Sequence, residues 1–204
     1  RGRLVFDRHL IKDMTSFAGW NFLGSGTFIV NTQGINLLSN VFFGVAVNAA
    51  RGVALQVESI VKHLVSGSLT ALNPQIIKSY ANSEKEYCFS LVFTGIKFSF
   101  LAIWLVALPL FFEADTLLVL WLGNVPENAT LFLKLSMFCL LADMVCNPIV
   151  TLVLATKQIK EYYIVTGLVS LLAFVFSWLG FRSGLQAWSA YVIFFLKIHC
   201  SGLI

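Results

Sequence analysis

A stripe of polar and charged side chains lies in a stretch of sequence that is otherwise apolar enough for a lipid bilayer. Its charged members are Arg51, Glu58 and Lys62. At about 100° per residue the stripe covers less than a quarter of a helical turn. It consists of Asn48, Arg51, Leu55, Glu58, Lys62, Ser66, Leu69 and Asn73. A charge at the centre of a membrane helix costs about 2.5–3.5 kcal/mol, so we expect this stripe to face protein or water.

Arg51 is the member of the stripe best suited to bind phosphate, because a planar guanidinium donates two parallel hydrogen bonds. Glu58 precedes Lys62 by four residues, the favourable order for an ion pair along a helix. Such a pair would leave Arg51 as the net charge, and Lys97 on the next apolar segment could add to it. The stripe therefore predicts a membrane-buried path for an anionic, phosphate-bearing substrate. The alternative is an ion network that only holds helices in register.

Two further polar faces lie on neighbouring apolar segments. The first segment carries Asn21, Ser25, Thr32, Asn36 and Ser39 on one face, which could line a cavity or bind helices together. Another segment carries Ser136, Asp143, Asn147 and Thr151. Asp143 is expected near mid-membrane, where an acid is either functional or hydrogen-bonded to a neighbouring helix; Lys97 could also simply reach the membrane surface.

From these faces we predict two groups of functional residues. Asp143 and Asn147 are candidates for coupling or for a supporting network. The predicted substrate-binding residues are Arg51, Lys62, Glu58, Asn48, Asn36 and Lys97.

The composition indicates an all-α, polytopic membrane protein. Hydrophobic residues make up 58% of the chain and charged residues 12%, against about 45–50% and about 25% in soluble domains. The mean hydropathy is +0.83. The apolar runs are long and continuous rather than alternating, which favours helices over a membrane barrel. A chain of 204 residues has room for about six helical spans.

We expect a basic lead-in over residues 1–13, followed by a six-helix bundle over 14–198. A turn near Gly44 separates the first two spans, and Asn73-Pro74 ends or kinks the second, leaving residues 75–86 as a polar linker. Residues 116–122 form a short amphipathic turn. The predicted spans are about 14–44, 46–72, 88–112, 129–155, 162–181 and 186–202.

The distribution of basic residues predicts that the N-terminus of this segment is cytoplasmic, because Lys and Arg concentrate in inner loops. Since the chain opens at Arg1 rather than Met, we also expect it to be a piece of a longer protein. The four cysteines lack metal-ligand spacing and are interpreted as small core residues. No catalytic motif is present. The sequence therefore predicts a protein that is not an enzyme, with no metal, no cofactor and no nucleic-acid partner.

Several stretches of this sequence resemble a known family. They are Gly34-Ile35-Asn36-Leu37-Leu38, Phe42-Phe43-Gly44, Val47-Asn48-Ala49-Ala50-Arg51-Gly52-Val53-Ala54, Gln56-Val57, Asn73-Pro74-Gln75-Ile76-Ile77-Lys78-Ser79-Tyr80-Ala81, Ala155-Thr156, Ile159-Lys160 and Tyr162. Together they resemble the bacterial polysaccharide-biosynthesis flippases of O-antigen type, within the multidrug/oligosaccharidyl-lipid/polysaccharide exporter superfamily. The resemblance covers about residues 17–166, is most specific over 34–81, and fades after Gly184.

The resemblance implies a transporter of twelve or more helices in two six-helix halves, which form a V open alternately to each side. This chain would be the second half, and the missing N-terminal half would be its partner. The substrate would be a polyprenyl-pyrophosphate-linked oligosaccharide, carried across the bacterial inner membrane through a cationic central cavity. Membrane lipids would surround the helices.

The alternative within the same superfamily is a cation-coupled multidrug exporter. Cation sites need carboxylates, whereas the predicted intramembrane charges are Arg51, Lys62 and Lys97 against Glu58 and Asp143, which favours the flippase. A membrane scaffold would show packing stripes without aligned charges. A membrane-embedded enzyme of glycan assembly would need acids or a nucleophile at a membrane surface.

Overall fold

The computed structural model describes residues 8–156 and 159–202, and these residues form helices without any strand. The expected lead-in falls outside the described residues over positions 1–7, as does the loop position Lys157. The all-α prediction is confirmed. The helices are α1 (Arg8–Ala81), α2 (Lys85–Phe112), α3 (Ala114–Leu122), α4 (Ala129–Ala155), α5 (Ile159–Arg182) and α6 (Ser189–Gly202).

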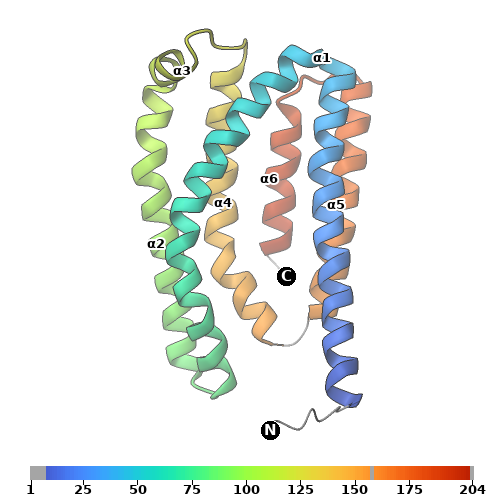
Figure 1. The fold of residues 1–204 in the computed structure, drawn as a ribbon, viewed down its shortest axis with the longest axis vertical. Coiled ribbons are helices and arrows are strands. Elements are labelled where there is room, and N and C mark those ends of the chain that lie inside the picture. Colours follow the sequence, from blue (N-terminus) through green and yellow to red (C-terminus); the bar gives the residue numbers. More distant parts are fainter. Residues whose placement is uncertain (1–7, 157–158, 203–204) are drawn as a thin grey trace, which may run out of the picture.

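Helix α1 bends sharply at Gly44, where φ is 81° and ψ is 177°. This backbone region is essentially restricted to glycine, so Gly44 sets the position of the bend. The predicted turn near Gly44 is confirmed. It divides α1 into an N-arm, residues 8–43, and a C-arm, residues 45–81. Both arms extend from the bend towards the same end of the molecule, so the chain direction reverses between them (Figure 1).

The C-arm continues helically through Pro74 to Ala81, so Asn73-Pro74 does not end the helix. Residues 75–81 are helical rather than part of the polar linker predicted over 75–86, and residues 85–86 already belong to α2. Ile76 is completely buried against Cys88, Leu91 and Val92 at the start of α2. That packing holds the turn of helix after Pro74, although the proline ring removes a donor and crowds the preceding turn. The actual connection to α2 is residues 82–84.

The largest core lies between the C-arm, α2 and α4. Ala54, Val61 and Val65 of the C-arm pack in one cluster with Leu133 and Leu140 of α4. Ala54 is completely buried in this cluster, and small residues of this kind are common where membrane helices meet. In the N-arm, Gly34 allows a close approach to α5.

The N-arm packs on α5. A Cβ built on Gly34 would lie 2.6 Å from the ring of Phe174, so only glycine allows this close approach. Asn31 Nδ2 donates a hydrogen bond to the backbone oxygen of Ser170, at 2.7 Å. Helix α6 lies between α4 and α5 and contacts both (Figure 1).

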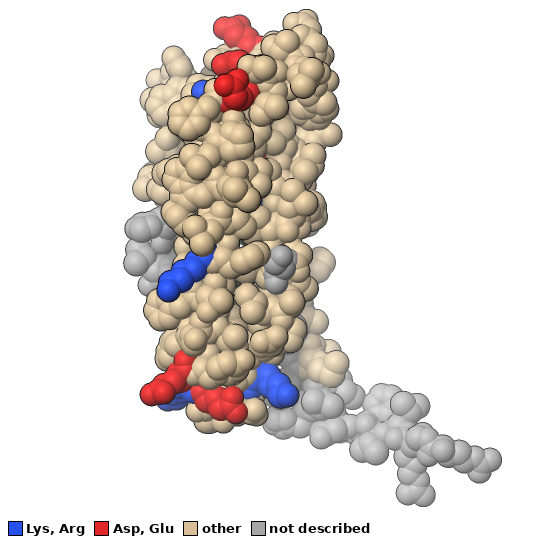
Figure 2. Space-filling model, turned by 90° about the vertical axis from the view of Figure 1, so that its left-hand side faces the viewer, with Lys and Arg blue, Asp and Glu red and all other residues tan. Residues whose placement is uncertain are grey.

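Within the described residues, four helices are long and apolar enough to cross a membrane: α1 over Ser25–Gly67, α2, α4, and α5 over Lys160–Arg182. Figure 2 shows the side of the molecule on which charged residues gather mainly at the two ends. The predicted number of six spans is not confirmed. Helix α6 has 14 residues in the described part of the chain, about 21 Å of helix, against a hydrocarbon core of about 30 Å. The predicted short amphipathic turn over 116–122 lies within α3.

Replacing Gly44 with alanine tests whether its backbone conformation fixes the bend. A Cβ at Gly44 would meet no atom within 4 Å, so the penalty comes from backbone strain alone, roughly 1–3 kcal/mol. We expect Gly44→Ala to lower the unfolding temperature of the purified chain in detergent.

The matched control is Gly52→Ala, on the C-arm. A Cβ there also meets nothing within 4 Å, but Gly52 is helical, and alanine favours helix by roughly 1 kcal/mol. Gly52→Ala should leave the unfolding temperature unchanged or raise it. Equal behaviour of the two variants would show that the bend does not depend on glycine.

Candidate functional site

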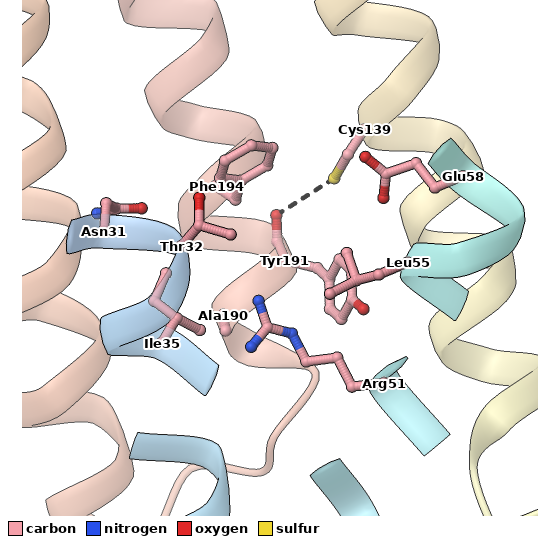
Figure 3. Close-up of a pocket in the computed structure, with 10 residues that line it drawn as sticks. All are labelled: Asn31, Thr32, Ile35, Arg51, Leu55, Glu58, Cys139, Ala190, Tyr191 and Phe194. Carbon is pink, nitrogen blue, oxygen red and sulfur yellow. Dashed lines mark hydrogen bonds between the residues drawn. The ribbon is translucent and has the colours of Figure 1, made fainter. Parts of the chain in front are cut away.

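A small cavity lies between the two arms of α1, beside α4 and α6 (Figure 3). Its volume is about 90 Å³, room for about three water molecules. The wall combines residues from four parts of the fold that are far apart in sequence. They are Asn31, Thr32 and Ile35 of the N-arm, Arg51, Leu55 and Glu58 of the C-arm, Cys139 of α4, and Ala190, Tyr191 and Phe194 of α6.

Arg51 is the cation of this cavity. Its side chain is only 8% exposed, and its Nη1 donates a hydrogen bond to Asn36 Oδ1 at 2.6 Å. The guanidinium carbon lies 5.9 Å from the ring centroid of Tyr191, within the range of a cation–π contact. Neither Arg51 Nε nor Tyr191 Oη has a hydrogen-bond partner among the described residues. Buried donors are normally satisfied, so this end of the cavity suits an acceptor such as a phosphate oxygen or a water.

Glu58 lines the same cavity, two helical turns beyond Arg51, a rise of about 10 Å along the C-arm. Lys62 does not pair with Glu58 as predicted; it pairs with Asp143 instead. Lys62 Nζ lies 2.6 Å from Asp143 Oδ2 of α4, because the C-arm packs on α4 at this level. The cavity wall therefore holds one cation and one anion, rather than the group of cations that a cationic central cavity requires.

Asp143 thus bonds to a neighbouring helix, which is one of the two roles predicted for it. The pair is not deeply buried, with side-chain exposures of 42% for Lys62 and 39% for Asp143. A second link between the same helices lies further along, where Thr151 Oγ1 donates to Asn73 Oδ1 at 3.2 Å. The second half of the polar stripe, from Lys62 to Asn73, therefore joins the C-arm to α4.

The other predicted residues lie away from the cavity. Asn48 is half-buried one turn before Arg51, and Asn147 is half-buried on α4, where its backbone oxygen accepts from Thr151. Lys97 is exposed on α2 and does not line the cavity. Of the six predicted substrate-binding residues, the structure brings together Asn36, Arg51 and Glu58.

Sequence reasoning did not single out Tyr191, Phe194 and Asn31. Tyr191 and Phe194 lie in an apolar helix where no spacing distinguishes them from packing residues. Asn31 directly precedes Thr32, a member of the polar face of the first segment. Its amide could therefore have indicated a position near the site.

The described cysteines do not form a metal site. Cys88, Cys139 and Cys146 are free thiols, and the described residues contain no group of three or more ligands that could hold a metal ion. Cys139 Sγ donates a weak hydrogen bond to the backbone oxygen of Tyr191 at 3.6 Å (Figure 3). This contact helps seat α6 against α4.

No protein-family model, curated protein or solved structure matches this chain.

Exchanging the charges of Lys62 and Asp143 tests whether their contact joins the C-arm to α4. We expect Lys62→Asp and Asp143→Lys each to lower the unfolding temperature in detergent, because each leaves two like charges together where one intramembrane charge already costs about 2.5–3.5 kcal/mol. The double exchange should recover most of the loss. Lys97→Asp is the control: it inverts the charge of an exposed lysine on α2 and shows how much charge inversion alone changes the unfolding temperature. If the two single losses simply add in the double variant, the pair is not coupled.

Proposed function

We propose that this chain is one half of a transporter that moves polyprenyl-pyrophosphate-linked oligosaccharide across the bacterial inner membrane for surface polysaccharide biosynthesis. The observation that carries the proposal is the Arg51 guanidinium, buried in a cavity between apolar helices and held by Asn36 with one donor unused. The oxygens of a pyrophosphate can accept a hydrogen bond from such a donor. The motif residues of 34–81 that resemble the O-antigen flippases include both Asn36 and Arg51.

The size of the cavity limits what it can hold. A volume of about 90 Å³ has room for a small charged group but not for an oligosaccharide. In the proposal, Arg51 engages the phosphate end of the carrier, while the sugars occupy space between this chain and the other half of the transporter. No covalent step is required. Alternating opening of the two halves would move the substrate, with the N-terminus of this segment in the cytoplasm.

Glu58 gives this site a second possible ligand contact. In the flippase, its carboxylate would accept a hydrogen bond from a single sugar hydroxyl that reaches into the cavity from the space outside it. In a cation-coupled multidrug exporter the same carboxylate would bind the coupling ion or a cationic drug. The observation that supports this second function is that Glu58 lines the cavity while Lys62 is paired with Asp143.

Removing the Arg51 charge tests the flippase. The complete transporter is reconstituted in liposomes, and translocation of a fluorescent polyprenyl-pyrophosphate oligosaccharide is measured. Loss of a charge-assisted hydrogen bond, about 1.5–3 kcal/mol, predicts that Arg51→Ala slows translocation roughly 10- to 100-fold. Arg51→Lys should restore only part of the rate, because an ammonium lacks the planar fork.

Arg182→Ala is the matched control, because Arg182 is exposed at the end of α5, where it contacts the Trp178 ring at 5.5 Å. It should translocate at the unmodified rate. Translocation indifferent to Arg51→Ala, at equal protein in the liposomes, would return Arg51 to a structural role and remove the main support for this function.

Glu58→Gln separates the two candidate functions. An amide still exchanges hydrogen bonds with sugar hydroxyls, so lipid-linked oligosaccharide translocation should fall by less than about tenfold. A cation site loses its charge, so ion-driven efflux of a cationic dye should stop. Dye efflux that requires Glu58, together with no oligosaccharide translocation, would establish the exporter and exclude the flippase.

A further inference from the structure

A large apolar groove runs between α5 and α6, away from the Arg51 cavity. Its volume is about 830 Å³, and it is lined mostly by aliphatic and aromatic side chains, among them Val169, Ala173 and Ile193. The residues at its edges are strongly exposed: Leu172 is 55%, Phe176 58% and Leu196 56% exposed. In a membrane such a groove opens to lipid. Along α5 it extends from Val169 to Ser183, about 21 Å at 1.5 Å per residue.

Lys197 marks one end of this groove. It lies on α6, is only 8% exposed, and its Nζ lies 5.3 Å from the Phe194 ring centroid. The same lysine lines an adjoining recess of about 410 Å³. The two cavities therefore meet at a buried ammonium group.

The recess differs from the groove in its chemistry. Hydroxyl-bearing side chains from the N-arm and from α5 form much of its wall. They are Ser25, Thr27, Tyr162, Tyr163, Thr166 and Ser170. No aspartate or glutamate is among the described residues that line either the recess or the groove.

The recess lies towards the end of α5 that carries Lys160 and the Tyr162–Tyr163 pair, whose ring centroids are 5.6 Å apart. Tyrosines concentrate at the boundary between membrane and water. The groove runs in the other direction along α5. Its length of about 21 Å is about two thirds of the roughly 30 Å hydrocarbon core. A polar recess at one end and an apolar groove beyond it match the two parts of a lipid.

We propose that this site binds one anionic phospholipid of the surrounding membrane, with its phosphate beside Lys197 in the recess and an acyl chain in the groove between α5 and α6. Lysine binds phosphate as a point charge, and the hydroxyl-bearing side chains make the wall around it polar. A headgroup that carries an amine is disfavoured, because the recess offers no carboxylate to pair with it. The site shares no lining residue with the Arg51 cavity, and the inference does not depend on the proposed transport function.

Native mass spectrometry of the purified chain in detergent, titrated with phosphatidylglycerol, tests the inference. We expect Lys197→Gln to weaken phosphatidylglycerol binding about tenfold, the effect of losing one charge-assisted contact. Lys97→Gln removes an exposed lysine from α2 and should leave this binding unchanged. Leu172→Trp places a bulky ring at the exposed edge of the groove, where it does not disturb the core, and should weaken binding without changing any charge.

Two ligand comparisons separate the headgroup from the chain. Phosphatidylcholine with identical acyl chains should bind more weakly than phosphatidylglycerol, and glycerol phosphate, which has no chain, should not displace the lipid. Equal binding of the two phospholipids, or equal loss in Lys197→Gln and Lys97→Gln, would overturn the phosphate site at Lys197. Displacement by glycerol phosphate, or undiminished binding to Leu172→Trp, would overturn the chain site in the groove.

Discussion

The hydrogen bond from Arg51 to Asn36 joins the two arms of α1 on either side of the Gly44 bend. Arg51 is only 8% exposed and its guanidinium needs acceptors, because an unsatisfied charge among apolar helices costs several kcal/mol. Asn36 supplies one acceptor only if the chain has reversed direction between the two residues. The bend and the buried charge therefore depend on each other: Gly44 brings the arms together, and Arg51 is tolerable only because they meet.

The polar stripe on the C-arm has two environments, although its residues share one helical face. At Arg51 and Glu58 the neighbouring elements are the N-arm and α6, and a cavity remains between them. At Lys62 and Asn73 the neighbour is α4, which supplies Asp143 and Thr151 as direct partners. The same periodicity thus produces a ligand-sized space in one half and helix-to-helix contacts in the other. The polar path predicted along the whole stripe is limited to its first half.

Local backbone features could be predicted from the sequence. A glycine inside a long apolar run indicated the bend at Gly44, and the alternation of apolar and polar stretches indicated α2, α4 and α5 to within a few residues. Pro74 misled, because its local effect was outweighed by the burial of Ile76 against α2. The length of α6 could not be judged from hydropathy, since its apolar part, Ser189–Ile198, is shorter than a bilayer crossing requires.

Partner choice was the part of the site that sequence could not supply. The spacing of Glu58 and Lys62 satisfies the rule for a pair on one helix, but that rule describes an isolated helix, where such a pair contributes only about 0.2–0.5 kcal/mol. A carboxylate on an adjacent helix, only 2.6 Å from the ammonium nitrogen, competes easily with so small a preference. Once Asp143 takes Lys62, Glu58 is left to the cavity, and the cavity holds charges of both signs. One contact between helices therefore determines the electrostatic character of a site that begins one turn away, which is why residue types and spacing alone identified Arg51 but misjudged the net charge around it.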